Sequence, residues 1–303
     1  MTLGPLLSLL LVLAVAPVLP GIATRTRAFL TGRRGAPVLQ LYRDLAKLLR
    51  KNVIYSRTTT PVFRLGPIVS LVSILVAATL LPLDGHTALF GFSGDLVAFT
   101  GLLGLGRFAL VLAGLDTGSS FEGMGASREV TVSAFAEPAL LLGLTVLVLA
   151  TGELSLAGML GEQLAAAWAR TLPSLVLAAA ALFMVALAET SRVPVDDPAT
   201  HLELTMIHEV IILDHSGPEL AMILYGQALK LALFGVLVVS AVVPRALLPS
   251  GMAALALLGG LVLIAAAVGV VESSMARLRL NRVPQFLVAA GALAVFAVIL
   301  LLR

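Results

Sequence analysis

The sequence contains no cysteine among its 303 residues. Iron–sulfur clusters are held mainly by cysteine thiolates, and a disulfide bond requires two cysteines. The chain therefore cannot ligate an iron–sulfur cluster through thiolates, and it cannot form a disulfide. If the protein takes part in redox chemistry, the clusters must belong to partner subunits.

Charged residues are also scarce: they make up 12% of the chain, whereas hydrophobic residues make up 59%. Soluble domains are about 25% charged and about 45–50% apolar. This imbalance predicts an all-α polytopic membrane protein, in which lipid replaces much of the usual buried core. The net charge of +3 does not indicate nucleic-acid binding, because the basic residues gather in loops, where membrane topology explains them.

Eight apolar runs are each close to the roughly 20 residues that a helix needs to cross a bilayer. They cover residues 3–19, 62–81, 96–115, 132–150, 172–188, 220–243, 252–271 and 286–302. The first run lacks a basic flank and a clear cleavage site, so it is predicted to be a retained helix. With no repeat and no soluble insertion, residues 1–303 are predicted to form a single integral membrane domain.

The first loop sets the predicted orientation. Residues 25–64 carry ten Lys or Arg and a single acid, Asp44. By the positive-inside rule this loop faces the cytoplasm, and eight spans then place both termini outside. Within the loop, residues 37–51 repeat leucine at i, i+4, i+7 and i+8, which predicts an amphipathic interfacial helix. That helix either anchors the chain in lipid or forms the wall of a cavity between the membrane and a partner.

Titratable residues gather in residues 189–219, between two apolar runs. This segment holds seven of the seventeen acidic residues and three of the four histidines. Such groups beside a bilayer are costly unless water, partners or protons satisfy them. The segment is therefore predicted to move protons or ions, or to dock a partner. Its candidate coupling residues are Glu189, Asp196, Asp197, Glu203, His208 and Glu209.

A capping box that begins at Thr200 predicts a helix over residues 200–214. The histidines of this segment recur every seven residues, at His201, His208 and His215. Seven helical residues span about 10.5 Å, whereas one ion needs ligands about 2 Å away, so no metal site is predicted. Two interpretations remain: a relay of acids, histidines and water, or a solvated loop that faces a partner.

Further charges lie within or beside the apolar runs. Arg107 and Glu137 are predicted to pair across neighbouring spans, because a lone central charge costs about 2.5–3.5 kcal/mol. Lys230 lies either near the midplane or at the interface, which its long side chain can reach. Glu137 and Glu272 join the candidate coupling residues. The candidates for balancing their charge are Arg107, Arg128, Arg192 and Lys230.

A second polar segment covers residues 116–130, DTGSSFEGMGASREV. It lacks the GK[ST] ending and the preceding strand of a phosphate-binding loop. A tight, glycine-rich loop that packs against a partner protein is predicted instead. The candidate docking residues are Asp116, Gly118, Gly123, Gly125 and Glu129.

Three segments, ETSRVPVDDPATHLELTMIHE, LDTGSSFEGMGASRE and QLYRDLAKLL, together resemble a known family. It is the family of the membrane subunits of formate hydrogenlyase and hydrogenase-4, which are homologous to the complex I subunit that joins the redox arm to the membrane arm. The resemblance implies an eight-helix coupling subunit beneath a nickel–iron hydrogenase, in the cytoplasmic (inner) membrane of a bacterium or archaeon. The nickel–iron centre and the iron–sulfur clusters would lie in partner subunits, with no cofactor in this chain.

The partners that the resemblance implies are the hydrogenase large and small subunits, an iron–sulfur protein and antiporter-like membrane subunits. The first alternative is a quinone-binding subunit of a complex I-like NADH dehydrogenase. It is disfavoured because TGRRGAP stands where quinone-reducing relatives have a GPNRVG-like motif. A stand-alone ion transporter is disfavoured by the absence of a repeat and by titratable groups that gather at one face.

Overall fold

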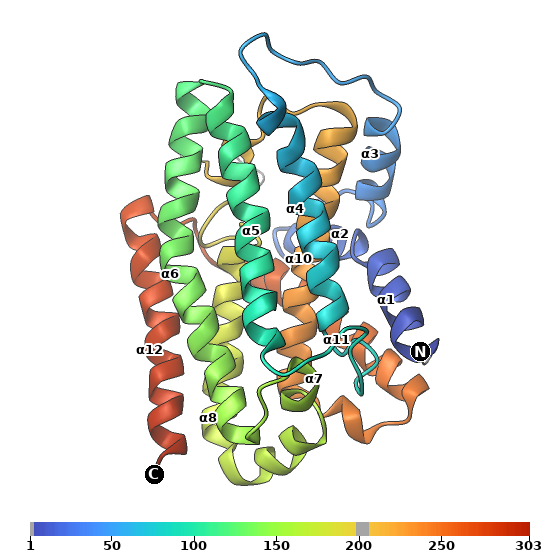
Figure 1. Ribbon diagram of the computed structural model, residues 1–303, viewed down its shortest axis with the longest axis vertical. Helices are drawn as coiled ribbons and strands as arrows, with labels where there is room; N and C mark the ends of the chain where they lie inside the picture. Colours follow the sequence, from blue (N-terminus) through green and yellow to red (C-terminus); the bar gives the residue numbers. More distant parts are fainter. Residues whose placement is uncertain (1–2, 198–205) are drawn as a thin grey trace.

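The computed structural model describes residues 3–197 and 206–303, and every element in these residues is a helix (Figure 1). The long helices are α4 (Pro61–Leu80), α5 (Asp95–Asp116), α6 (Ser120–Thr151), α8 (Glu162–Glu189), α10 (Gly217–Val242), α11 (Ser250–Ser274) and α12 (Val283–Leu301). The short elements are α1 (Leu3–Val15), α2 (Val18–Leu30), α3 (Gln40–Leu48), α7 (Leu156–Met159), α9 (His208–Ile211), η1 (Arg245–Leu247) and η2 (Leu280–Arg282).

All seven long helices are long and apolar enough to cross a bilayer, and each contains one of the predicted apolar runs or nearly all of it. The pair α1 and α2 meets the same test as one broken span. The prediction of an all-α polytopic membrane protein is therefore confirmed.

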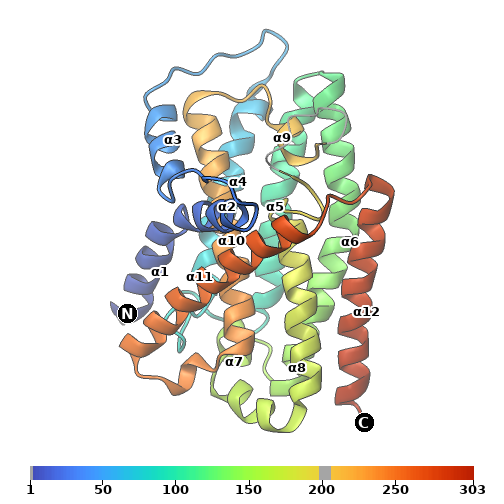
Figure 2. The same cartoon turned by 180° about the vertical axis from the view of Figure 1, so that it is seen from behind.

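The first predicted span differs from the structure. Residues 3–19 do not form one helix: α1 ends at Val15, and α2 continues at an angle of 44° to it. Pro17 and Pro20 explain the break, because proline has no N–H to donate to the carbonyl four residues earlier. As a result α2 runs across the bundle, where it appears end-on in Figure 2.

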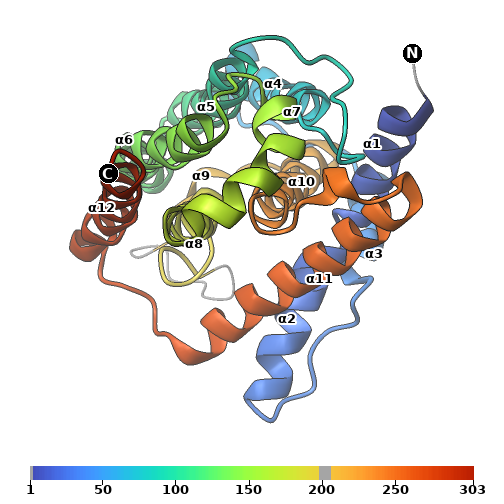
Figure 3. The ribbon, with the colours of Figure 1, turned by 90° about the horizontal axis from the view of Figure 1, so that it is seen from below.

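The bundle is organised around α10, which packs against α4, α8 and α11. Its membrane-spanning window is 78% buried, more than that of any other span in the described residues. Figure 3 shows α10 enclosed by its neighbours, whereas α11 and α2 cross on the outside. Small residues permit the closest contacts: a Cβ on Gly66 of α4 would come within 2.6 Å of Ala113 on α5.

The predicted loop over residues 116–130 is largely helical. Helix α6 begins at Ser120, so Gly123, Gly125 and the residues up to 130 belong to its first turns. The connection from α5 is short, and Gly118 makes the turn with a φ of +71°. Glycine was interpreted as a sign of a loop, whereas in this position it allows another segment to approach a helix.

The structure also differs from the helix predicted over residues 200–214, as far as these residues are described. Only His208–Ile211 is helical, and Thr200 and Glu203 lie outside the described residues. The Asp196 carboxylate accepts hydrogen bonds from the backbone N–H groups of Ile207 and His208, so it holds the start of this short helix. The predicted interfacial helix is present as α3, although it is shorter than residues 37–51.

Candidate functional site

Arg107 is the centre of a group of charges contributed by α5, α6, α8 and α10, which is buried except for Glu137, whose side chain is 46% exposed. Its guanidinium lies 2.8 Å from Glu137, which confirms the predicted pair. It also lies 2.6 Å from both carboxylate oxygens of Glu189 and 3.6 Å from Glu129. Glu189 was predicted at the end of its span, and it is the last residue of α8. We call Arg107, Glu129, Glu137, Glu189 and Lys230 the central charge cluster.

Lys230 completes this cluster from the middle of α10. Its ammonium lies 2.8 Å from Glu189 Oε2, and the residue is only 5% exposed. The Lys230 side chain therefore ends inside the bundle, while its position at the midplane or at the interface stays a prediction. Two cations face three carboxylates, so the fully ionised cluster has one negative charge in excess. Because an excess charge within membrane-spanning helices is costly, the cluster favours the binding of one proton or cation.

Three other ion pairs hold the segment between α8 and α10, and we call them the loop ion pairs. They are Arg27–Asp197 at 3.1 Å, Arg192–Glu272 at 3.2 Å and Arg277–Asp196 at 3.1 Å. Unlike the central charge cluster, each of them is a single cation facing a single carboxylate. Arg27 and Arg277 were missed in the sequence, where the positive-inside rule was enough to explain both.

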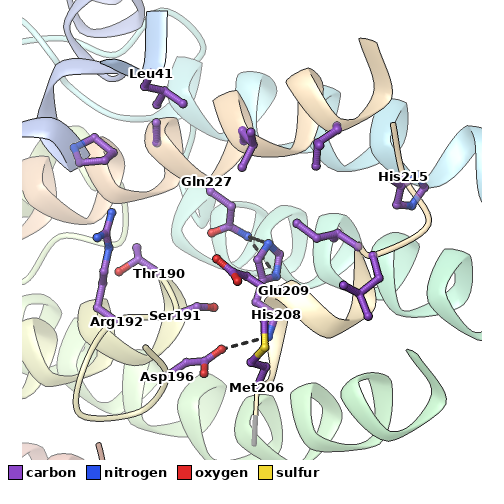
Figure 4. Close-up of a pocket in the computed structure, with 16 residues that line it drawn as sticks. Leu41, Thr190, Ser191, Arg192, Asp196, Met206, His208, Glu209, His215 and Gln227 are labelled. Atoms are coloured by element: carbon purple, nitrogen blue, oxygen red, sulfur yellow. Dashed lines mark hydrogen bonds between the residues drawn. The ribbon is translucent and has the colours of Figure 1, made fainter. Parts of the chain in front are cut away.

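A large cavity of about 430 Å³ lies beside these pairs, and Figure 4 shows its lining. Leu41 of α3 lines it, which favours the interpretation of that helix as a cavity wall. His208 and Gln227 point toward each other in its interior, with Gln227 Nε2 2.9 Å from His208 Nε2. Asp196, Glu209 and Arg192 also line this cavity. Glu209 thus faces the cavity, whereas Glu203 lies outside the described residues.

The protonation state of the cavity histidines follows from their burial. Burial, with the positive charge of Lys230 nearby, lowers the pKa of His208 to about 4. The neutral ring can then accept the hydrogen bond that Gln227 donates. Burial also lowers the pKa of His215, although its hydrogen bond with Glu219 acts in the opposite direction.

A small cavity of about 20 Å³ lies between the large cavity and the central charge cluster. It is lined by Arg107, Glu129 and Lys230 on one side and by His208 and Gln227 on the other. This volume suits about one water molecule, which needs at least roughly 10–15 Å³ and several polar partners. Polar groups therefore extend from the large cavity through His208 and Gln227 to the central charge cluster. In the sequence, His208, Arg107, Lys230 and Glu129 were candidate residues, but nothing indicated that they meet around one cavity.

Most of the predicted docking residues have partners inside the chain. The Asp116 carboxylate accepts from the backbone N–H groups of Thr60 and Phe63, so it holds the start of α4. A Cβ on Gly125 would lie 3.0–3.1 Å from atoms of α9 and Ile207. Arg128 donates to the Met206 carbonyl at 2.7 Å. Gly123 differs from these residues, because a Cβ there would meet nothing within 4 Å.

Residues 4–302 match the family model described as NADH dehydrogenase. The chain belongs to this family. It is 35% identical over 292 residues to formate hydrogenlyase subunit 4 of Escherichia coli (strain K12), a match that covers 93% of this chain and 92% of the relative. It is 36% identical over 234 residues to hydrogenase-4 component C of the same strain, covering 77% of this chain and 73% of the relative. The family predicted from the three sequence segments is confirmed.

Other members of the family are more distant. A subunit of the NADH-quinone oxidoreductase of Polaromonas naphthalenivorans (strain CJ2) is 27% identical over 215 residues, covering 67% of this chain and 58% of the relative. A solved chain of the membrane-bound sulfane sulfur reductase, an archaeal respiratory membrane complex, superposes with a TM-score of 0.83 at 19% identity, over 99% of this chain and 98% of that one. This last likeness shows the fold. The chain is a multi-pass membrane subunit of the kind that assembles with partner subunits.

Proposed function

We propose that this protein is the membrane-anchoring and coupling subunit of an energy-converting (group 4) nickel–iron hydrogenase or formate hydrogenlyase complex. It links electron transfer in the peripheral arm to proton or sodium translocation. The names of the two Escherichia coli relatives and the family membership support this function. The complex lies in the cytoplasmic membrane of a bacterium or archaeon, with residues 25–64 inside and both termini outside.

The observation that carries this proposal is the succession of polar groups from the large cavity, through His208 and Gln227, to the small cavity beside the central charge cluster. A cluster with one carboxylate in excess changes its proton occupancy when a charge appears nearby. One elementary charge about 10 Å away contributes about 1.7 kcal/mol at an effective dielectric constant of about 20, which is more than one pKa unit. Reduction of a partner's redox centre above the cavity is therefore sufficient to draw a proton or cation inward.

The redox centres themselves belong to partners in this proposal. The chain has no cysteine, and its described residues contain no group of three or more His, Asp or Glu that fits a metal ion. The hydrogenase large and small subunits supply the nickel–iron centre, and together with an iron–sulfur protein they supply the clusters. They dock at the end of the bundle that carries α3 and α9, while antiporter-like subunits lie alongside in the membrane.

Purification in mild detergent tests this function. We expect the chain to co-purify with nickel, iron and a hydrogen-evolving module that builds an ion gradient in vesicles. A complex without nickel that reduces quinone would contradict the proposal. Orientation has its own test, because this cysteine-free chain accepts a single probe: Arg33→Cys should react with an impermeant thiol reagent only from the cytoplasmic side.

A quinone-binding subunit of a complex I-like dehydrogenase is the second candidate, and the large cavity favours it. Its volume of about 430 Å³ lies within the range of about 300–1,000 Å³ that is usual for small-molecule sites. Apolar residues such as Leu41 and Leu224 line it together with polar groups, among them the His208–Gln227 pair. A photoreactive quinone that labels this cavity and is displaced by unlabelled quinone would favour this second function over the first.

A further inference from the structure

The end of α2 forms a hairpin with the segment that follows it. Gly32 reverses the chain with a φ of +69°, and the Arg33 N–H donates to the Ala28 carbonyl at 2.8 Å. The returning segment then lies against the helix, since a Cβ on Gly35 would come within 2.8 Å of the Ala28 Cβ. The two antiparallel segments thus have a defined separation, which depends on glycine at position 35.

The two faces of α2 have different surroundings. Ala23 is fully buried and Arg27 pairs with Asp197, so this face is directed toward the bundle. Arg25 and Phe29, which lie four residues apart on the opposite face, are exposed, Phe29 to 81%. The hairpin encloses a groove of about 450 Å³, which we call the α2 groove. Its lining residues are Arg25, Phe29, Arg33, Arg34, Gly35 and Pro37.

The α2 groove is strongly basic and has no countercharge in its lining. Within residues 3–197 and 206–303, neither Arg25 nor Arg33 nor Arg34 forms an ion pair. The guanidinium groups of Arg25, Arg33 and Arg34 lie around the exposed ring of Phe29. This arrangement suits a ligand that has both an anionic and an apolar part. Arginine suits phosphate in particular, because its planar group donates two parallel hydrogen bonds.

The contact between α2 and α11 shows which end of the bundle the groove lies near. A Cβ on Gly269 would lie 2.5 Å from the Ala23 carbonyl oxygen, so the two helices touch there. Gly269 is five residues before the end of α11 at Ser274, which corresponds to about 7.5 Å at 1.5 Å per residue. The contact is thus near the end of a membrane-spanning helix that the predicted orientation places at the cytoplasmic headgroup region, and Figure 3 shows the end of α2 projecting beyond α11, away from the bundle.

We propose that the α2 groove is a binding site for an anionic phospholipid of the adjacent leaflet. The headgroup phosphate is held by Arg25, Arg33 and Arg34, and Phe29 lies against the acyl chains. Basic pockets at the cytoplasmic side of membrane helices have the chemistry to recognise such headgroups. The site is independent of the proposed coupling function, because it lies on the opposite face of α2 from the loop ion pairs.

A photo-crosslinking experiment tests the occupant directly. The full chain, with p-benzoylphenylalanine in place of Phe29, is placed in nanodiscs of phosphatidylcholine that contain a small fraction of phosphatidylglycerol. After irradiation, mass spectrometry compares the two lipid adducts with the bulk lipid ratio. We expect phosphatidylglycerol to be enriched about tenfold or more, and the enrichment to vanish in the triple variant Arg25→Gln, Arg33→Gln, Arg34→Gln.

A matched control removes the same charge elsewhere in the loop. The triple variant Arg43→Gln, Arg50→Gln, Arg57→Gln changes three exposed residues outside the groove and should keep the enrichment. Gly35→Val keeps every charge but forces the hairpin apart, and should lose it. Adducts at the bulk ratio, the absence of a lipid adduct, or equal loss in both triple variants would overturn the proposal. If Gly35→Val kept the enrichment of phosphatidylglycerol, the proposal would also be overturned. Charge alone would then attract the lipid, and the shape of the α2 groove would have no part in binding.

Discussion

The central charge cluster and the loop ion pairs are both built from basic side chains and carboxylates, but they differ in the ratio of cations to carboxylates. Each loop ion pair joins one cation to one carboxylate, and it ties the segment between α8 and α10 to α2, to α11 or to the segment after α11. The cluster joins two cations to three carboxylates around Arg107. A matched pair has its lowest energy when both groups stay ionised, so it stabilises one arrangement. An unmatched set gains from taking up a proton, so it can respond to its surroundings.

The largest effect should come from Glu189→Gln, because Glu189 contacts both cations of the cluster. The substitution keeps the shape of the side chain but removes its charge, leaving two carboxylates for two cations. The complex should assemble, while the ion gradient formed per hydrogen falls about a hundredfold or more, which is the range usual for the loss of a proton-transfer group. Fluorescent pH or sodium indicators in vesicles measure this. Wild-type gradients would mean that the charge excess has no part in coupling.

Gly125→Leu and Gly123→Leu separate the contact with α9 from the docking of partners. A side chain at position 125 has no room beside Val210 and Ile211, so overpacking should cost about 1–3 kcal/mol and loosen α9. Position 123 faces open space, so Gly123→Leu should leave the thermal stability of the chain unchanged and release the soluble module from membranes. Co-sedimentation and thermal unfolding measure the two outcomes. If Gly123→Leu keeps the module bound, α6 does not form the docking surface.

His208 lies between the large cavity and the central charge cluster, and it makes the stability of the protein depend on pH. Its pKa of about 4 in the folded protein is below the ordinary value of 6.5, so protons bind more readily to the unfolded chain. The stability that depends on the neutral ring is complete above pH 6.5 and is lost progressively as the pH falls toward 4. Between pH 7 and 5 the loss should be about 2 kcal/mol.

His208→Gln should remove that part of the acid sensitivity. Thermal unfolding in detergent across this pH range compares the variant with the parent chain. Parallel pH profiles in the two proteins would show that folding does not shift the pKa of His208, contrary to the surroundings described above.

The smallest effect is expected from Arg27→Gln in the loop ion pairs. Arg27 is 30% exposed in its side chain, so breaking its pair with Asp197 should cost about 0.2–1 kcal/mol. Gradient formation should stay at the wild-type level, in contrast to Glu189→Gln. A loss of gradient with unchanged stability would mean that the Arg27–Asp197 pair takes part in coupling. The central charge cluster and the loop ion pairs would then no longer differ in function.

The sequence predicted the membrane spans well, because a bilayer requires long apolar runs that are visible without any tertiary information. The pairing of Arg107 with Glu137 was also predictable, since their spans are consecutive and therefore antiparallel neighbours. The contacts of Glu189 with Arg107 and Lys230 were not, because they depend on how α5, α8 and α10 meet across long stretches of chain. The break at Pro17 was not predicted, because residues 3–19 were assigned as one span from hydropathy.

Glycine misled the interpretation of residues 116–130. In soluble proteins it often signals a loop, whereas in membrane helices small residues let backbones approach closely. Gly125 shows the second use, since it makes room for α9. The roles of the individual coupling residues, including Glu203 and Glu272, remain predictions, because contacts alone do not reveal which groups change protonation during turnover.

The burial of Lys230 in α10 has a consequence for biogenesis. A helix with a lysine in its middle enters lipid at a cost of about 2.5–3.5 kcal/mol. The ribosome makes α8 before α10, so Glu189 is already in the membrane when Lys230 leaves the translocon. We therefore expect α10 to insert late, between helices that already hold its countercharge. A chain truncated after α10 should insert this helix, whereas the isolated α10 segment should be translocated far more often.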